Sequence, residues 1–148
     1  MFTVLLEKIY NILNSNNLIQ EVHTYEVGQF DGEPAAVIVP SGNDSDYATF
    51  AENSRIYAFN VRLYVARDSR SGESQKQADR VLRALVDSVL DDFDRDYLFD
   101  GLTVPTGYTM INVFALPSQW GYAGREDNYR VAEIVVRCRV RVDVTAIS

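Results

Sequence analysis

Apolar side chains recur every three or four positions in two segments of the chain, a spacing typical of helices that bury one face. The first segment covers residues 2–13 and ends at the polar run that begins with Asn14. Thr3 lies near its start and is a candidate for the side chain that caps the first turn. This segment therefore predicts a helix with one buried stripe.

The second helical segment follows a polar break at residues 68–72. Ser71 or Ser74 can supply the side-chain oxygen that caps its start. Its apolar stripe covers residues 78–93, so we expect a helix that ends near Asp94. Four acidic residues occupy this end: Asp91, Asp92, Asp94 and Asp96. Negative charge is unfavourable at a helix C-terminus, which predicts slight fraying or the recruitment of cations.

Five further segments are rich in β-branched and aromatic residues and predict strands. They are residues 18–27, 35–39, 55–67, 108–116 and 129–144. The turn dipeptide Asp31-Gly32 separates the first two, which predicts a hairpin. Pro40 and Pro117 end the second and fourth, because proline cannot donate to a sheet ladder. We expect long loops after the two prolines, at residues 41–54 and 118–128.

Regular alternation marks the third and fifth predicted strands. Every second residue is apolar from Tyr57 to Val65 and, in the last segment, from Ala132 to Val144. One face of each strand should therefore lie in the core. The order α-β-β-β-α-β-β predicts an α+β fold, with two helices packed on one face of a largely antiparallel β-sheet. Residues 1–148 are expected to form a single domain.

The composition is that of a folded protein, with 47% hydrophobic and 24% charged residues among 148. A net charge of −7 argues against a broad basic surface that grips DNA phosphates. No stretch is apolar over a length that crosses a membrane, and Glu7 and Lys8 interrupt the first apolar run too early for a signal peptide. We therefore expect a protein that has no membrane partner.

Candidate catalytic chemistry is sparse. His23 is the single histidine and lies in a predicted strand, and no serine stands in a Gly-x-Ser-x-Gly motif. Cys138 is the single cysteine, so one chain forms neither an internal disulfide nor a cysteine zinc site, and a reducing compartment fits best. Its place among valines predicts a buried, unreactive thiol. We expect no catalytic residues.

Motifs for metals and cofactors are also missing from the sequence. The acidic run at residues 92–96 imitates half of a calcium loop, but Tyr97 and Thr103 stand where such loops need glycine and glutamate. Neither of the usual glycine-rich phosphate loops occurs. We therefore expect no metal site and no bound cofactor.

The main basic concentration lies on the last predicted strand, where three arginines alternate with apolar residues: Arg137, Arg139 and Arg141. Side chains at alternate positions project from one side of a strand, and Arg62 can join them from another strand. Such a row can bind phosphate, pair with carboxylates across a protein interface, or remain solvated. On an acidic chain we favour the protein interface over the phosphate.

The two expected long loops supply the other interface candidates. The first carries Asp44, Asp46, Tyr47 and Phe50. The second carries Trp120 and Tyr122. Aromatic residues on loops are frequent contact residues, although they can equally fold back on their own core.

Several of these segments resemble those of tail terminator (tail completion) proteins of long-tailed bacteriophages. The resemblance rests on the second helix, the long last strand and five short stretches: residues 32–37 (GEPAAV), 43–49 (NDSDYAT), 52–53 (EN), 55–59 (RIYAF) and 117–122 (PSQWGY). It covers most of the chain in element order and size, with no diagnostic motif.

The resemblance implies a virion protein, made in the host bacterial cytoplasm, that forms a homohexameric ring. Such a ring stops polymerisation of the tail tube at the correct length and presents a surface for joining the DNA-filled head. The implied partners are other copies of the chain, the tail tube protein and a head-completion or neck protein. DNA would pass through the ring without specific binding, because an acidic protein repels it.

Two other classes of function remain open at this point. A head-completion or stopper protein of the same neck would have the same composition and would differ only in its position in the particle. A small enzyme or ligand-binding domain with a pocket lined by tyrosine and tryptophan would instead be a monomer or dimer stabilised by a small molecule.

Overall fold

The computed structural model describes residues 1–47, 52–67, 72–124 and 127–147, and for residues 43–47 it describes the backbone alone. It contains two helices and five strands in the predicted order. Their bounds are α1 Phe2–Asn14, β1 Glu21–His23, β2 Ala35–Tyr47, β3 Glu52–Ala66, α2 Gly72–Arg95, β4 Tyr108–Ala123 and β5 Tyr129–Asp143.

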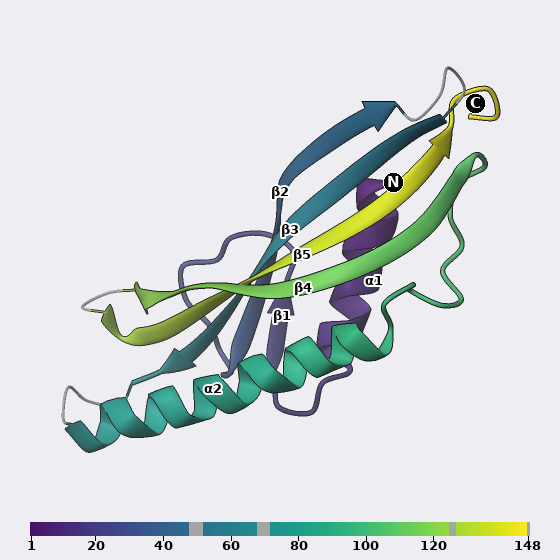
Figure 1. Ribbon diagram of the computed structural model, residues 1–148. Coiled ribbons are helices and arrows are strands. Elements are labelled where there is room, and N and C mark those ends of the chain that lie inside the picture. The colour runs from purple at the N-terminus through teal and green to yellow at the C-terminus, as the bar shows by residue number, and fades with distance from the viewer. Residues whose placement is uncertain (48–51, 68–71, 125–126, 148) are drawn as a thin grey trace.

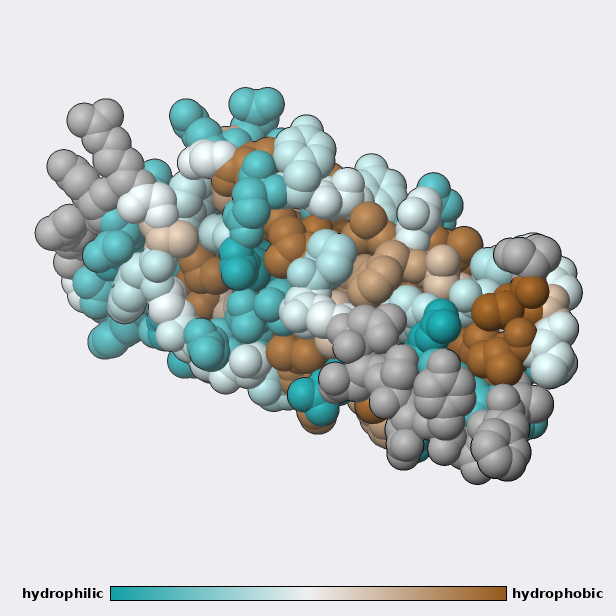
Figure 2. Space-filling view, turned by 90° about the horizontal axis from the view of Figure 1, so that it is seen from above, coloured by the Kyte–Doolittle hydropathy of each residue, from teal (hydrophilic) through white to brown (hydrophobic). Residues whose placement is uncertain are grey.

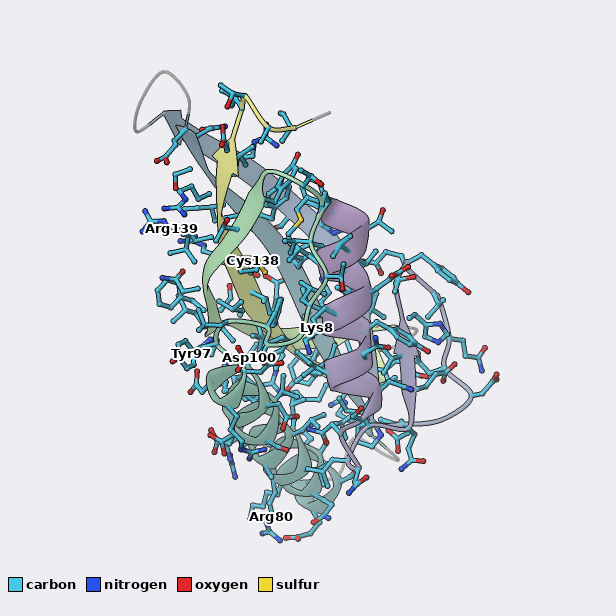
Figure 3. All side chains as sticks on the ribbon, turned by 90° about the vertical axis from the view of Figure 1, so that its right-hand side faces the viewer. Lys8, Arg80, Tyr97, Asp100, Cys138 and Arg139 are labelled. Atoms are coloured by element: carbon cyan, nitrogen blue, oxygen red, sulfur yellow. The ribbon has the colours of Figure 1, made fainter. Side chains whose placement is uncertain are left out.

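The strands form one sheet in the order β1-β2-β3-β5-β4, in which only β1 and β2 are parallel. Both helices lie on the same side of this twisted sheet (Figure 1). Figure 3 shows the other side open, with Arg139 directed away from α1 and Cys138 between the sheet and the helices. The predicted α+β fold is confirmed.

The hairpin predicted between the first two strands is wrong. β1 runs parallel to β2, with Glu21 opposite Ala35, and the predicted strand 18–27 contributes only three residues. The Glu21 carboxylate accepts hydrogen bonds from the backbone N–H groups of Asp31 and Gly32, both at 3.0 Å. These bonds hold the connecting loop back at the start of β1, so the chain enters β2 in the same direction.

The predicted strand ends at Pro40 and Pro117 are also wrong. β2 continues past Pro40 to Tyr47, and β4 continues past Pro117 to Ala123. The register shifts beside each proline, between Pro40 and Gly42 and between Pro117 and Trp120. Each proline lies where its strand has no neighbour on the outer side, so the missing N–H breaks no ladder bond.

The main core lies between the helices and the sheet. Leu5, Ile9 and Leu13 face it from α1, and six residues face it from α2: Ala78, Leu82, Leu85, Val86, Val89 and Phe93. The alternating apolar residues of β3 and β5 are buried against them, as predicted. The cap proposed for α1 is wrong, because α1 begins at Phe2 with Met1 as its N-cap. Of the two candidates for α2, Ser74 lies inside the helix. Ser71 falls outside the described residues.

A smaller apolar cluster covers one end of the open face. Phe30, from the loop between β1 and β2, packs on Tyr64 of β3 and Tyr129 of β5, with ring centroids 4.8 and 5.4 Å away. Ala35 and Val37 complete the buried part of this cluster. The rest of the open face carries no such cover among the residues described.

The acidic end of α2 recruits polar groups from α1, which agrees with the expectation of cations there. Lys8 Nζ lies 3.0 Å from the carboxylate of Asp96. Asn16, just after α1, donates from Nδ2 to Asp92 at 2.7 Å and to Ser88 at 3.0 Å. These contacts tie the two helices together.

Candidate interaction surface

Three arginines line the open face of the sheet on β5. Arg137, Arg139 and Arg141 alternate with buried Val136, Cys138 and Val140, so all three point away from the helices. Each of the three is exposed. Among the described residues, no hydrogen bond or ion pair joins them to another side chain. The structure thus brings the predicted row together without an ion pair among the described residues. Asp143, two residues beyond Arg141, is the acidic group beside it, and hydrogen bonds from Thr145 together with the charge of Arg141 lower the pKa of Asp143.

Arg62 lies on the same face but does not extend the unpaired row. Its Nε lies 3.2 Å from Glu133 of β5, and its Nη1 pairs with Glu26 of the loop that carries Phe30. The charge of Arg62 is therefore neutralised by its own chain. The free part of the basic row begins beyond Glu133, at Arg137.

Exposed apolar side chains stand beside the arginines on β4. Phe114 and Leu116 are each 53% exposed and lie opposite Arg137 and Val135 of β5 in the sheet register. The sequence analysis did not select them. The available signal was that residues 108–116 are apolar at odd and even positions alike, although the helices can bury only one face. Large exposed apolar side chains next to unpaired charges mark contact surfaces.

The open face is hollowed between β2, β3 and β5. Gly42 and Ala58 are small and lie opposite each other, and Ala58 is opposite Arg137. A cavity of about 430 Å³ opens here, bordered on one side by Arg137. A projecting side chain of a partner can enter this hollow.

Trp120 and Tyr122 lie on β4 and not on a loop, because the strand continues past Pro117. The guanidinium of Arg130 lies 4.7 Å from the ring centre of Tyr122 and 5.9 Å from that of Trp120. Arg67 covers Tyr122 as well, at 4.8 Å. The aromatic residues are 44% and 49% exposed, so each is held by its own chain and still presents about half of its surface.

Arg130 is the anchor of this group, and the sequence analysis missed it. Its Nε lies 2.7 Å from Asp79 of α2, and its Nη1 donates to the carbonyl of Gly121 at 2.7 Å. The side chain thus connects α2 to the end of β4. The signal is weak in the sequence, because Asp79 and Arg130 are 51 residues apart.

The remaining interface candidates lie on or near the β2–β3 hairpin. Asp44, Asp46 and Tyr47 belong to β2 and not to a loop, paired with Ile56, Ser54 and Asn53 of β3. In the same register Ile56 is opposite Arg139, and Ser54 is opposite Arg141. The prediction for Phe50 falls outside the described residues.

The two candidate catalytic residues, His23 and Cys138, both contact or lie among residues of their own sheet. His23 Nε2 lies 2.7 Å from Glu21 Oε1, and the backbone hydrogen bond from Gly32, with that from His23, lowers the pKa of Glu21. Burial raises the pKa of the Cys138 thiol to about 12.

No group of three potential metal ligands occurs within the described ranges. None of the helices described there is long and apolar enough to span a membrane.

Comparison with known proteins gives a structural match without a sequence match. No family model matches the chain, and no curated protein is detectably similar to it. The fold is similar to that of a solved chain described as "Virion of native gene transfer agent (GTA) particle", with a TM-score of 0.55 and 14% sequence identity. The match covers 93% of this chain and 94% of the other, so the similarity of fold extends over nearly the full length of both chains.

Proposed function

We propose that the protein is a structural component of a phage-like virion and acts as a tail terminator. In this role copies of the chain form a ring at the end of the tail tube, and the family resemblance implies six copies. The ring ends polymerisation of the tube and offers the surface to which the head or neck is joined. The chain would be made in the cytoplasm of the host and then incorporated into the virion.

The observation that carries this proposal is the fold match to a chain of a gene transfer agent virion over nearly the full length of both chains. The resemblance of the short stretches at residues 32–37, 43–49 and 117–122 to tail terminators supports the particular role. The open sheet face adds a further argument, because its arginines and its exposed Phe114 and Leu116 have no partner in the described part of the chain.

The proposed work is binding and not catalysis. His23 is held by a carboxylate, Cys138 is fully buried, and the described residues offer no cluster for a metal. The partners are other copies of the chain, the tail tube protein and a neck protein. With a net charge of −7, the protein would let DNA pass through the ring without binding it.

The decisive experiment measures the mass of the purified protein alone and after mixing with tail tubes, followed by electron microscopy of any rings. We expect rings at one end of each tube, and tubes that no longer grow. A solitary chain that never joins a tube would overturn the proposal. Rings located one layer away, on the head side of the neck, would instead assign the chain to a head-completion or stopper role.

Trp120 offers a variant that separates assembly from folding. Trp120 is 44% exposed, and the guanidinium of Arg130 lies against its indole. Trp120→Ala should therefore weaken assembly of the oligomer and leave the monomer folded. Mass measurement gives the first quantity, and circular dichroism with urea unfolding gives the second. Loss of the monomer fold in this variant would assign Trp120 to the core.

A further inference from the structure

No side chain that the structure describes forms a hydrogen bond or an ion pair with the three arginines of β5. Arg137, Arg139 and Arg141 are exposed on the face opposite α1, as Figure 3 shows for Arg139. Phe114 and Leu116 lie beside the row and expose about half of their surface. An exposed surface of this kind is both apolar and positively charged, although the whole chain is acidic.

A complementary row lies on the solvent side of α2. Asp87, Asp91 and Asp94 are separated by four and three residues, so they follow one stripe of the helix. All three are exposed, and within the described ranges none forms a hydrogen bond or an ion pair. The neighbouring acids Asp92 and Asp96 differ, because Arg95 and Lys8 pair with them.

We propose that the arginine row of one copy docks on the acidic stripe of α2 in the next copy. This proposal rests on the proposed ring and names the contact that would build it. The occupant of the open face is therefore a second copy of the same chain, held by guanidinium–carboxylate pairs. The contact also removes Phe114 and Leu116 from water, which adds a hydrophobic contribution.

The spacing of the two rows supports this pairing. Arginines at alternate positions of a strand are about 6.7 Å apart, so the row extends over about 13 Å. The aspartates at positions i, i+4 and i+7 of a helix rise by about 6 and 4.5 Å, over about 10.5 Å in all. The difference is small beside the reach of an arginine side chain, so three pairs can form together.

The position of the two rows favours contact between copies over contact within one copy. The arginines lie on the open face, whereas α2 packs on the opposite face of the sheet (Figure 3). Different patches on one chain that bind each other form head-to-tail contacts, which close into a ring when the rotation between copies allows it. The proposed contact thus has the type of symmetry that a ring requires.

Exchanging the charges tests the contact. Arg139→Glu and Asp91→Arg change the middle residue of each row, and each variant alone should weaken self-association at least about tenfold. The double variant Arg139→Glu/Asp91→Arg should recover it, and so should a mixture of the two single variants, because every interface then has opposite charges again. Association is measured by analytical ultracentrifugation at low and high salt, and salt should weaken it.

Matched controls distinguish this contact from a general effect of charge. Asp31→Arg makes the same change as Asp91→Arg at an exposed position outside the two rows, and Lys76→Glu reverses a positive charge about three helical turns before Asp87. Both should associate as the wild type does. A wild type that remains a monomer at every concentration, with and without tail tubes, overturns the ring and the contact together. A wild-type ring that the single variants leave intact, or that the double variant does not restore, overturns the contact alone. If the wild type retained duplex DNA and Arg139→Glu did not, the arginine row would bind DNA phosphates, and this result would also overturn the proposed contact between copies.

Discussion

A single asparagine joins the two helices at the residue scale. Asn16 is 8% exposed, and its amide donates to Ser88 and Asp92 of α2. Its oxygen accepts a hydrogen bond from the backbone N–H of Leu18 at 2.9 Å. A buried polar side chain is tolerated here because each of its groups has a partner.

Replacing Asn16 by alanine should therefore lower the free energy of unfolding by about 1–3 kcal/mol, because Asp92 and Ser88 lose a donor in a partly buried site. Urea unfolding measures this change. Asn17→Ala is the matched control, since Asn17 is exposed, and it should change stability by less than about 0.5 kcal/mol. Equal effects of the two substitutions would contradict the linking role of Asn16.

Cys138 gives stability a dependence on pH. Its thiol pKa is raised by burial from 9.0 to about 12, so between these values only the unfolded chain loses the proton. Proton loss from the unfolded state alone favours unfolding, and the contribution of the thiol therefore falls by about 1.4 kcal/mol per pH unit above pH 9.

Comparison with Cys138→Ala isolates this effect from that of other groups. The stability advantage of the wild type over the variant should shrink between about pH 8 and about pH 10.5 in urea titrations. An advantage that stays constant over this range would show that the thiol is as acidic in the folded as in the unfolded chain.

Side-chain direction could be predicted from the sequence where the pattern was strict. The alternation in residues 129–144 placed Cys138 inside and Arg137, Arg139 and Arg141 outside, as observed. Phe114 and Leu116 escaped notice because apolar residues on both faces of a strand do not show which face is covered. That information lies in the tertiary packing of the helices.

At the scale of elements, the outer edge of β4 is partly protected from further pairing. The N–H of Val113 donates to the carbonyl of Tyr97 at 2.7 Å, so the chain after α2 covers one position of this edge. Two residues on, Ala115 faces outward in the same way, because backbone directions alternate along a strand. Pro117, after a further two residues, has no N–H to offer.

Amide hydrogen exchange should reveal this protection. In dilute protein we expect the Val113 amide to exchange at least about tenfold more slowly than that of Ala115, because in the described part of the chain Val113 has a hydrogen-bond acceptor on this edge and Ala115 has none. NMR resolves the two signals. Similar rates would mean that the contact with Tyr97 opens easily, leaving the whole edge available for another strand.

The type and order of the elements could be predicted, but not the ends of β2 and β4. A proline predicts the end of a strand that has neighbours on both sides. Pro117 lies on the edge strand β4, and Pro40 lies on the part of β2 that extends beyond its pairing with β1. The sequence contains no direct record of where a strand lacks a neighbour. The candidate residues Trp120 and Tyr122 were therefore assigned to a loop that is in fact a strand.

At the scale of the whole molecule, the arginine row and the aspartate row lie on different faces. The arginine row belongs to β5 and lies on the open side of the sheet, and the aspartate row belongs to α2 on the helical side. Seen from above, apolar side chains form separate patches between polar ones (Figure 2). A molecule of this kind presents different chemistry in different directions, and its net charge alone does not describe how it meets a partner.

DNA binding tests which of these charges dominates at long range. With a net charge of −7, the wild type should not retain duplex DNA in a gel-shift assay at about 0.15 M salt. A salt-sensitive complex under these conditions would mean that the arginine row outweighs the overall repulsion. A basic channel wall in a map of the assembled ring would likewise contradict free passage of DNA.

The loop that carries Phe30 has a consequence for any partner on the open face. Phe30 packs on Tyr64 and Tyr129, and Glu26 from the same loop pairs with Arg62, so this end of the face stands higher than the rest. A partner lying along the strands can slide toward the loop only until it meets this step. The loop would then limit how far a neighbouring copy extends along the strands, so that every copy would bind its neighbour at the same position.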